Sequence, residues 1–417
     1  MEKSLILTGW SKRGCLAAVL GGVVYMLGAM SRVAVPGMVF ERIAAEYGFS
    51  PAQVALLPSA GVVGCMAFIG LGGVAVDRFG WLKMLLLGTL LQIVGYLPVH
   101  ESADLPLLLA GEFINGGGRT MVYLSMLKFL DVSFDRRYFA ALLGIFYIFS
   151  YGGTLAASAV FPSLEGWCGS WQHAARALNF ATLALAASIV LVMPSWRSAR
   201  PMGASAVREA FPWRGMLASF RHPAARRAMV IAALNIAVYW SFLCVVAAPF
   251  ARRTGEVSIV SEMNWVVMFG MVFSGSICLH LGNRRRPFFV WGGAALALGF
   301  GLLALSSPGL AVARTAYLLI GAGYGVTSVL LTGVKECVPP LYMASAIGFT
   351  NFLANVAQVG CNQASGRLMA FGDGAWPWIF AIYLALSVIS LTLSASRGGL
   401  WYNSRPMISS VDFATFK

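Results

Sequence analysis

The chain has 417 residues, of which 59% are hydrophobic and only 11% are charged, whereas soluble domains carry about a quarter charged residues. Together with a mean hydropathy of +0.76, this excludes a soluble globular protein, because only a lipid bilayer can cover so much apolar surface. The net charge of +14 is typical of the basic loops that orient membrane proteins. It does not indicate a nucleic-acid partner, since no basic domain interleaved with aromatic residues lies outside the apolar segments.

Twelve apolar segments along the chain are long enough to cross a bilayer, for which about twenty residues suffice. The first six are residues 15–40, 54–76, 84–99, 105–127, 139–161 and 175–193. The other six are residues 228–250, 261–281, 288–306, 311–334, 343–369 and 376–395. The sequence therefore predicts an all-α integral membrane protein with twelve transmembrane helices.

The distribution of Lys and Arg between the loops predicts the orientation. With both termini in the cytoplasm, 22 of these residues lie on the cytoplasmic side, 6 lie on the opposite side, and Arg32 and Arg119 lie inside spans. The longest polar segment, residues 194–227, divides the chain into a six-helix bundle at 1–193 and a second bundle with a short cytoplasmic tail at 228–417. We therefore expect a multi-pass protein of the cytoplasmic (inner) membrane with a basic cytoplasmic linker.

The segment between the second and third spans reads GVAVDRFGWLK, residues 73–83. It resembles the G-x-x-x-D-R-x-G-R-K signature of the major facilitator superfamily, although the basic pair that follows the second glycine is missing here. The resemblance implies two pseudo-symmetric six-helix bundles that carry a solute by alternating access. It also implies a gating loop made by Gly73, Asp77, Arg78 and Gly80, in which Gly80 makes the turn.

Arg32 is the most informative polar residue, because a charge inside a span is costly and normally faces a cavity or a partner. It lies four residues before Pro36, an arrangement similar to that in organic-anion members of the superfamily, which implies contact with an anionic substrate. A guanidinium suits this role because it stays charged and offers a planar fork to a carboxylate. The alternative is that Arg32 pairs with Glu112. Tyr25, seven residues earlier, lies on the same helix face and is either a substrate contact or a packing residue.

Glu112 and Arg119 have the same spacing of seven residues in the fourth span. Glu112 stands where many relatives in the superfamily carry an arginine. Two roles remain open for this carboxylate. It either titrates and couples transport to protons, or it only neutralises a neighbouring arginine.

Two stripes of polar side chains follow helical spacing. One lies in the fifth span and contains Tyr147 and Tyr151, and the other lies in the eleventh and contains Asn351, Asn355 and Gln358. The seventh span adds the pair Asn235 and Tyr239. We expect these residues to line a central cavity that binds substrate; the alternative is hydrogen bonding between helices.

These features predict a monomeric secondary active transporter for a small organic anion, with proton coupling left open. Drug or metabolite efflux is the alternative within transport, and a non-transporting membrane sensor is the alternative outside it. An enzyme is not expected, because the four histidines lie far apart without acidic partners. The seven cysteines form no C-x-x-C pair, so no metal or cofactor is expected either.

Overall fold

The computed structural model describes residues 12–101, 104–134, 139–192, 220–221, 223–282, 284–305, 309–338 and 343–396. All the regular secondary structure in these residues is helical, which confirms the predicted all-α class. Each of the twelve predicted spans lies in a helix or in a run of helices broken at a bend, apart from residues 193 and 306 at two span ends, which fall outside the described part. By length and apolar composition, seven described segments could cross a membrane, or eight if the bent pair at 145–168 is one span.

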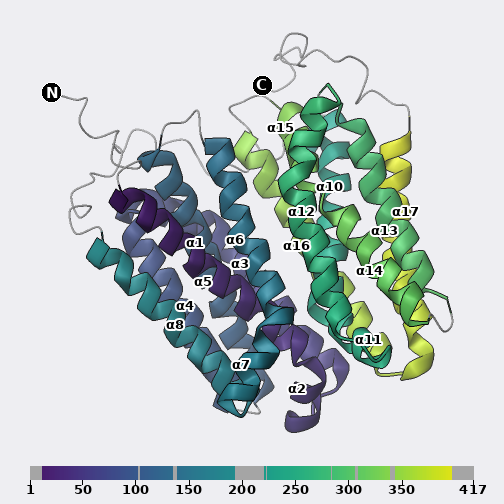
Figure 1. Ribbon diagram of the computed structural model, residues 1–417, viewed down its shortest axis with the longest axis horizontal. Coiled ribbons are helices and arrows are strands. Elements are labelled where there is room, and N and C mark those ends of the chain that lie inside the picture. The colour runs from purple at the N-terminus through teal and green to yellow at the C-terminus, as the bar shows by residue number, and fades with distance from the viewer. Residues whose placement is uncertain are drawn as a thin grey trace. The chain divides into compact units, whose positions relative to one another are not determined.

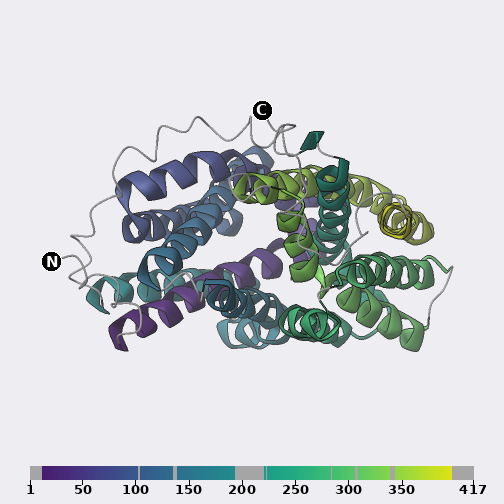
Figure 2. The same cartoon turned by 90° about the horizontal axis from the view of Figure 1, so that it is seen from above.

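The chain forms two compact units. Unit 1 contains Met1–Phe49 and Leu56–Ala210, and unit 2 contains Ser50–Ala55 and Phe211–Lys417. Of the predicted linker, residues 194–219 and 222 lie outside the described part, and the first helix of unit 2 begins at Pro223. The helices of both units are long rods, as Figures 1 and 2 show.

Unit 1 is built from long helices that pack mainly α4 on α5, and α1 on α6 and α8. Short helices extend two of the rods. The elements are α1 (Lys12–Arg32), η1 (Val33–Met38), α2 (Phe40–Tyr47), α3 (Pro51–Phe79), α4 (Trp81–Glu101), α5 (Leu105–Ser133), α6 (Phe139–Ala159), α7 (Phe161–Cys168) and α8 (Trp171–Val192).

The first span loses regular α-helical geometry directly after Arg32. The following segment η1 contains Pro36 and is kinked at Val35, whose φ of −124° and ψ of 120° are not helical; proline both lacks an N–H and crowds the preceding turn. The continuation α2 is held against the α7–α8 region by side chains. Arg42 forms an ion pair with Glu165, and the Glu46 carboxylate accepts a hydrogen bond from Trp171 Nε1 at 3.0 Å.

Helix α5 approaches its neighbours through glycines. A Cβ placed on Gly116 would collide with the main-chain carbonyl of Gly61 on α3, and a Cβ on Gly118 would lie 2.5 Å from the carbonyl oxygen of Gly88 on α4. Small residues at such contacts let backbones pack closely inside a membrane, where no hydrophobic effect drives the helices together. The glycine cluster of the fourth span therefore serves packing between helices of unit 1.

This contact leads to a stability prediction. We expect Gly116→Ala to destabilise the protein by about 1–3 kcal/mol, because the new methyl group meets backbone, which can make room only by moving a helix. The matched control is Gly360→Ala on α16, where a Cβ would meet nothing within 4 Å. Thermal unfolding of the purified variants in detergent measures the difference. Equal midpoints for the two variants would contradict the close α3–α5 contact.

The turn between α3 and α4 is a single residue, Gly80, whose φ of 90° is the left-handed conformation that glycine tolerates best. Residues 73–79 of the signature are helical, so the loop is shorter than the sequence suggested. The side chains of Asp77 and Arg78 lie outside the described part. Trp81, which stands where the superfamily carries a basic residue, is buried and packs on Phe129 of α5 with ring centroids 4.6 Å apart. An apolar anchor thus replaces a charge at the start of α4.

Unit 2 packs α10 against α16 and α17, and α13 against α14 and α17. Two of its spans are broken, one at η5 and one at residues 325–326. The elements are α10 (Pro223–Ser241), η5 (Phe242–Val246), α11 (Ala247–Arg253), α12 (Ser258–His280), α13 (Arg286–Leu303), α14 (Leu310–Tyr324), α15 (Thr327–Glu336), α16 (Met343–Met369), η7 (Asp373–Ala375) and α17 (Trp376–Ala395).

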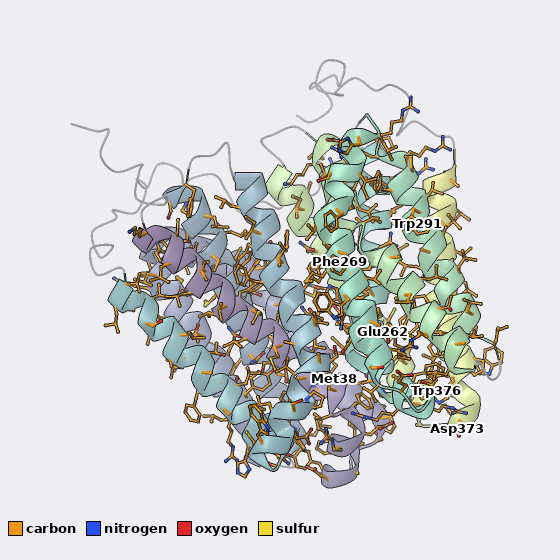
Figure 3. The ribbon with its side chains drawn as sticks, viewed as in Figure 1. Met38, Glu262, Phe269, Trp291, Asp373 and Trp376 are labelled. Atoms are coloured by element: carbon orange, nitrogen blue, oxygen red, sulfur yellow. The ribbon has the colours of Figure 1, made fainter. Side chains whose placement is uncertain are left out.

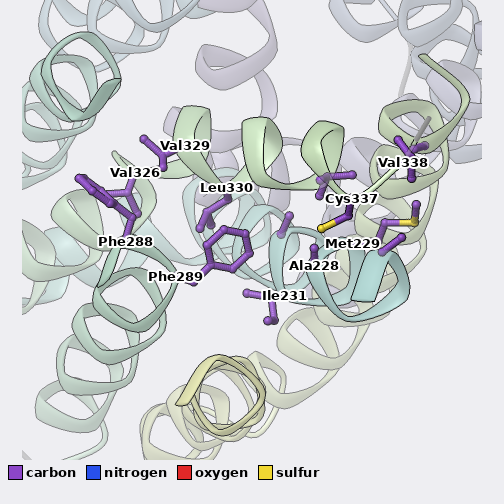
Figure 4. Close-up of a cluster of buried hydrophobic side chains, with 14 of the residues drawn as sticks. Ala228, Met229, Ile231, Phe288, Phe289, Val326, Val329, Leu330, Cys337 and Val338 are labelled. Carbon is purple, nitrogen blue, oxygen red and sulfur yellow. The ribbon is translucent and has the colours of Figure 1, made fainter. Parts of the chain in front are cut away.

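One end of unit 2 has a dense apolar core, drawn in Figure 4. Side chains from α10, α13 and α15 meet there, including Met229, Phe289 and Leu330, all of which are fully buried. Burying aliphatic or aromatic side chains of this size contributes about 1.5–3 kcal/mol each in water, and in a bilayer the same contacts contribute through close packing. This core fixes the positions of α10, α13 and α15 relative to one another at this end of unit 2.

Candidate substrate-binding site

Three charged side chains meet inside unit 1. Arg32 is the last residue of α1, and Glu112 and Arg119 lie on α5. Glu112 is only 2% exposed, and the charges of both Arg119 and Arg32 act on its carboxylate. The structure therefore brings together the substrate-contact candidate and the two coupling candidates that the sequence placed on separate helices.

Gly61 on α3 has no side chain, and this leaves room for two of these charged groups. Arg119 Nη2 lies 2.6 Å, and Glu112 Oε2 3.1 Å, from the position that a Cβ on Gly61 would occupy. Both groups therefore point at the same glycine, where any larger residue would displace them. Gly61 was not predicted, and only its spacing from the other glycines of α3 could have drawn attention to it.

The formal charges of this cluster do not balance. Two guanidinium groups act on one carboxylate, and within the described residues Glu112 Oε1 has no hydrogen-bond partner. A buried ion pair is stable only when its charges and its remaining hydrogen-bonding positions are compensated. Counted over these three residues alone, the formal charge is plus one, a sign that favours an anion over a cation. We call Arg32, Glu112 and Arg119 the charge cluster.

Aromatic rings extend from this cluster along unit 1. The Tyr25 ring stacks on Phe146 of α6 with centroids 4.6 Å apart and lies 5.9 Å from the ring of Tyr123 on α5. The hydroxyls of Tyr123 and Tyr147 are within hydrogen-bonding distance at 3.3 Å, and the charge of Arg32 reaches Tyr25. Two predicted tyrosines, Tyr25 and Tyr147, thus belong to one aromatic group through Tyr123.

Further unit 1 residues belong to this neighbourhood. Tyr151, one helical turn after Tyr147, is buried on α6. The sequence reasoning missed Tyr123, although it follows Arg119 by four residues and so shares its helix face. It also missed Tyr96 of α4, which is buried and on which the charges of Glu112, Arg119 and Arg32 all act. No local pattern marks Tyr96, because only the packing of α4 on α5 brings it there.

The predicted residues of the seventh span join a network inside unit 2. Asn235 donates to Ser390 Oγ of α17 at 3.2 Å, and the Tyr239 hydroxyl donates to Asn264 Oδ1 of α12 at 2.9 Å. The Tyr239 ring stacks on Tyr324 of α14 with centroids 3.7 Å apart. Asn235 and Tyr239 are nearly fully buried, and these two hydrogen bonds connect α10 to α17 and α12.

The eleventh-span stripe lies on α16 of unit 2. Asn351 and Asn355 are half-buried there, whereas Gln358 is buried. Among the described residues, Gln358 Nε2 has no hydrogen-bond partner, although a buried amide normally finds one. Within the residues that the structure describes, Gln358 therefore has a hydrogen-bond donor without an acceptor on the buried side of α16. In the described part of the chain, no group of three or more His, Cys, Asp or Glu residues is placed to hold a metal ion.

Comparisons with known proteins bear on the fold and the family. The sequence model of the Major Facilitator Superfamily matches residues 18–360. The multidrug resistance protein MdtL of Shigella flexneri serotype 5b is 25% identical over 365 residues, covering 84% of this chain and 88% of the relative. Among solved structures, the peptide transporter POT in complex with alafosfalin superposes with a TM-score of 0.74 at 14% identity, covering 97% of this chain and 100% of the other. The nucleoside transporter NupG gives a TM-score of 0.71 at 13% identity, covering 91% and 98%.

Proposed function

Because the chain belongs to the Major Facilitator Superfamily, and is thus a multi-pass membrane transporter, we propose that its substrate is a small organic anion with one negative charge. The observation that carries this proposal is the charge cluster, in which two arginines act on a single buried carboxylate. A monoanion bound at Arg32 makes the cluster neutral. A cation would add to the positive charge of the cluster.

A carboxylate is the chemical group that best fits Arg32. The guanidinium fork offers two parallel N–H donors, which match the two oxygens of a carboxylate. Tyr25, on which the charge of Arg32 acts, and Tyr147 of the same aromatic group would add hydroxyl donors and flat apolar surface for the body of a small organic molecule. Asn351, Asn355 and Gln358 of unit 2 are proposed as further substrate contacts, together with Tyr151, Asn235 and Tyr239.

Glu112 and Arg119 are proposed as the coupling pair. Protonation of Glu112 would raise the surplus of the charge cluster from one positive charge to two, which strengthens the binding of an anion at Arg32. By thermodynamic linkage, a bound anion in turn favours protonation of Glu112. Anion and proton would thus travel together, as in a symporter.

We propose an architecture of two six-helix bundles, residues 1–193 and 228–417, joined by the linker 194–227. Their movement would open the substrate site to one side of the membrane and then to the other. The excess of Lys and Arg on one side supports an orientation with both termini in the cytoplasm. We further propose that the protein works as a monomer in the cytoplasmic membrane. Residues Gly73, Asp77, Arg78 and Gly80 are proposed as the gating loop.

Drug efflux is the second candidate, because the curated relatives are named multidrug resistance proteins. The ring contacts of Tyr25, Tyr123 and Phe146 supply the aromatic surface that such a substrate would need. The two candidates differ in the sign of the charge that the site prefers.

A counterflow assay in proteoliposomes separates these candidates. Liposomes containing the purified protein are preloaded with one unlabelled compound, and exchange of its labelled form is followed for a panel of monocarboxylates, dicarboxylates, sugars and lipophilic cations. We expect exchange of monocarboxylates, faster with an inward proton gradient. Exchange of lipophilic cations without exchange of any carboxylate would instead establish efflux and contradict the anion proposal.

A further inference from the structure

Arginines gather at one end of unit 2, where α17 ends and α10 and α13 begin. Arg227 of α10 donates from Nε to the Leu393 carbonyl at 2.7 Å and from Nη2 to the Ser396 carbonyl at 2.8 Å. Arg286 of α13 donates from Nη2 to the Ala395 carbonyl at 2.9 Å. Two guanidinium groups from different helices therefore meet at the C-terminal carbonyls of α17, the negative end of that helix dipole.

These two guanidinium groups are close enough for the charge of Arg286 to act on Arg227. The carbonyls that accept these hydrogen bonds carry only partial negative charge. The neighbouring Arg285 differs, since it forms an ion pair with Glu336 at 2.8 Å. Additional arginines at this end are exposed: Arg221, Arg226 and Arg284. The end is thus strongly basic and suited to an anion.

Exposed apolar side chains continue from these arginines along the same helices. Trp291 of α13 is 50% exposed and Ile389 of α17 is 47% exposed; Figure 3 labels Trp291 on its helix. Helices α13 and α17 pack directly on each other, and a Cβ on Gly293 would lie 2.9 Å from Leu391 Cα. The charged donors at the helix ends match the phosphate headgroup of a phospholipid. The apolar side chains further along the same helices match its acyl chains.

We propose that this end of unit 2 binds an anionic phospholipid, with Arg227 and Arg286 at the headgroup phosphate and Trp291 and Ile389 along an acyl chain. Basic sites between transmembrane helices attract the acidic lipids of the cytoplasmic leaflet. Guanidinium groups form strong charge-assisted hydrogen bonds to phosphate. Tryptophan is enriched at the membrane interface, where headgroups and acyl chains meet. A free phosphate ion would use the arginines but not the apolar side chains. The apolar core beneath the arginines (Figure 4) holds their helices in place.

The test uses the full-length protein purified in a neutral detergent, with binding of phosphatidylglycerol measured by native mass spectrometry and by the midpoint of thermal unfolding. Phosphatidylcholine and inorganic phosphate are the comparison ligands. We expect phosphatidylglycerol alone to raise the midpoint. We also expect Arg286→Gln to weaken its binding about fivefold or more, as removal of one basic residue at an acidic lipid surface implies.

The matched control is Arg253→Gln, which removes the same charge at the end of α11, where Arg253 pairs with Asp373. Its affinity for phosphatidylglycerol should equal that of the wild type. If Arg286→Gln does not fold, Arg284→Gln removes an exposed charge from the same end, and a several-fold loss of affinity is again expected. Equal effects of phosphatidylcholine, an equal shift with inorganic phosphate, or unchanged binding by the variants would each overturn the proposal.

Discussion

Replacing Glu112 by glutamine is expected to destabilise the protein by about 1–2 kcal/mol, because the cost of burying the carboxylate offsets most of the ion pairing that the substitution removes. The substitution keeps the shape of a side chain that is 2% exposed and removes only its charge. Arg32 and Arg119 then lose the favourable interaction with this carboxylate. The free energy of unfolding, measured by SDS titration in mixed micelles, reports this loss.

Two further variants show whether charge is the cause. The double variant Glu112→Gln, Arg119→Gln should recover much of the lost stability, because its cluster again carries a single surplus charge. The control Glu41→Gln makes the same chemical change at an exposed position on α2 and should change stability by less than about 0.5 kcal/mol. If Glu112→Gln is as stable as the wild type, the carboxylate is not ionised in the resting protein, and the charge balance that we describe is wrong.

Replacing Arg32 by glutamine should lower carboxylate transport by about ten- to a hundredfold. Hydrogen bonds to a charged group contribute about 1.5–3 kcal/mol, and each 1.36 kcal/mol corresponds to a factor of ten. Arg32→Lys keeps the charge but loses the planar fork, so it should retain an intermediate rate. Initial rates of labelled carboxylate uptake into proteoliposomes provide the measurement.

The control for charge alone is Arg176→Gln on α8, where the arginine acts on Tyr47. This variant should transport at nearly the wild-type rate. Transport of a carboxylate by Arg32→Gln at the wild-type rate would show that Arg32 only pairs with Glu112. Survival of lipophilic-cation transport in the same variant would favour the efflux candidate.

The helices could be predicted well because a span of about twenty apolar residues is a strong constraint. In the described part of the chain, the twelve apolar segments lie in helices apart from bends and a few residues at span ends, and the predicted turn at Gly80 has the positive φ that glycine allows. The breaks within spans were harder to predict. Pro36 explains the one after Arg32. At residues 325–326 no proline is present, and Gly325 packs closely on Gly270 of α12, a contact that the local sequence does not reveal.

The candidate site was only partly predictable, for a physical reason. The cost of a charge in a membrane made Arg32, Glu112 and Arg119 stand out from the sequence alone, and their meeting in unit 1 agrees with that logic. A tyrosine carries no such cost, so Tyr96 and Tyr123 could not be told from packing residues. For the unit 2 candidates Asn235 and Tyr239, contact with substrate stays a prediction. In the structure these side chains hydrogen-bond Ser390 and Asn264, partners on other helices that the local sequence does not identify.

The most direct test of the charge cluster is equilibrium binding of a labelled monocarboxylate to the purified protein at two pH values. We expect saturable binding that becomes tighter at the lower pH, because protonation of Glu112 adds to the positive charge around Arg32. We also expect Arg32→Gln to weaken the binding about ten- to a hundredfold. Monocarboxylate binding that is independent of both pH and Arg32 would contradict the central claim that this cluster holds an anionic substrate.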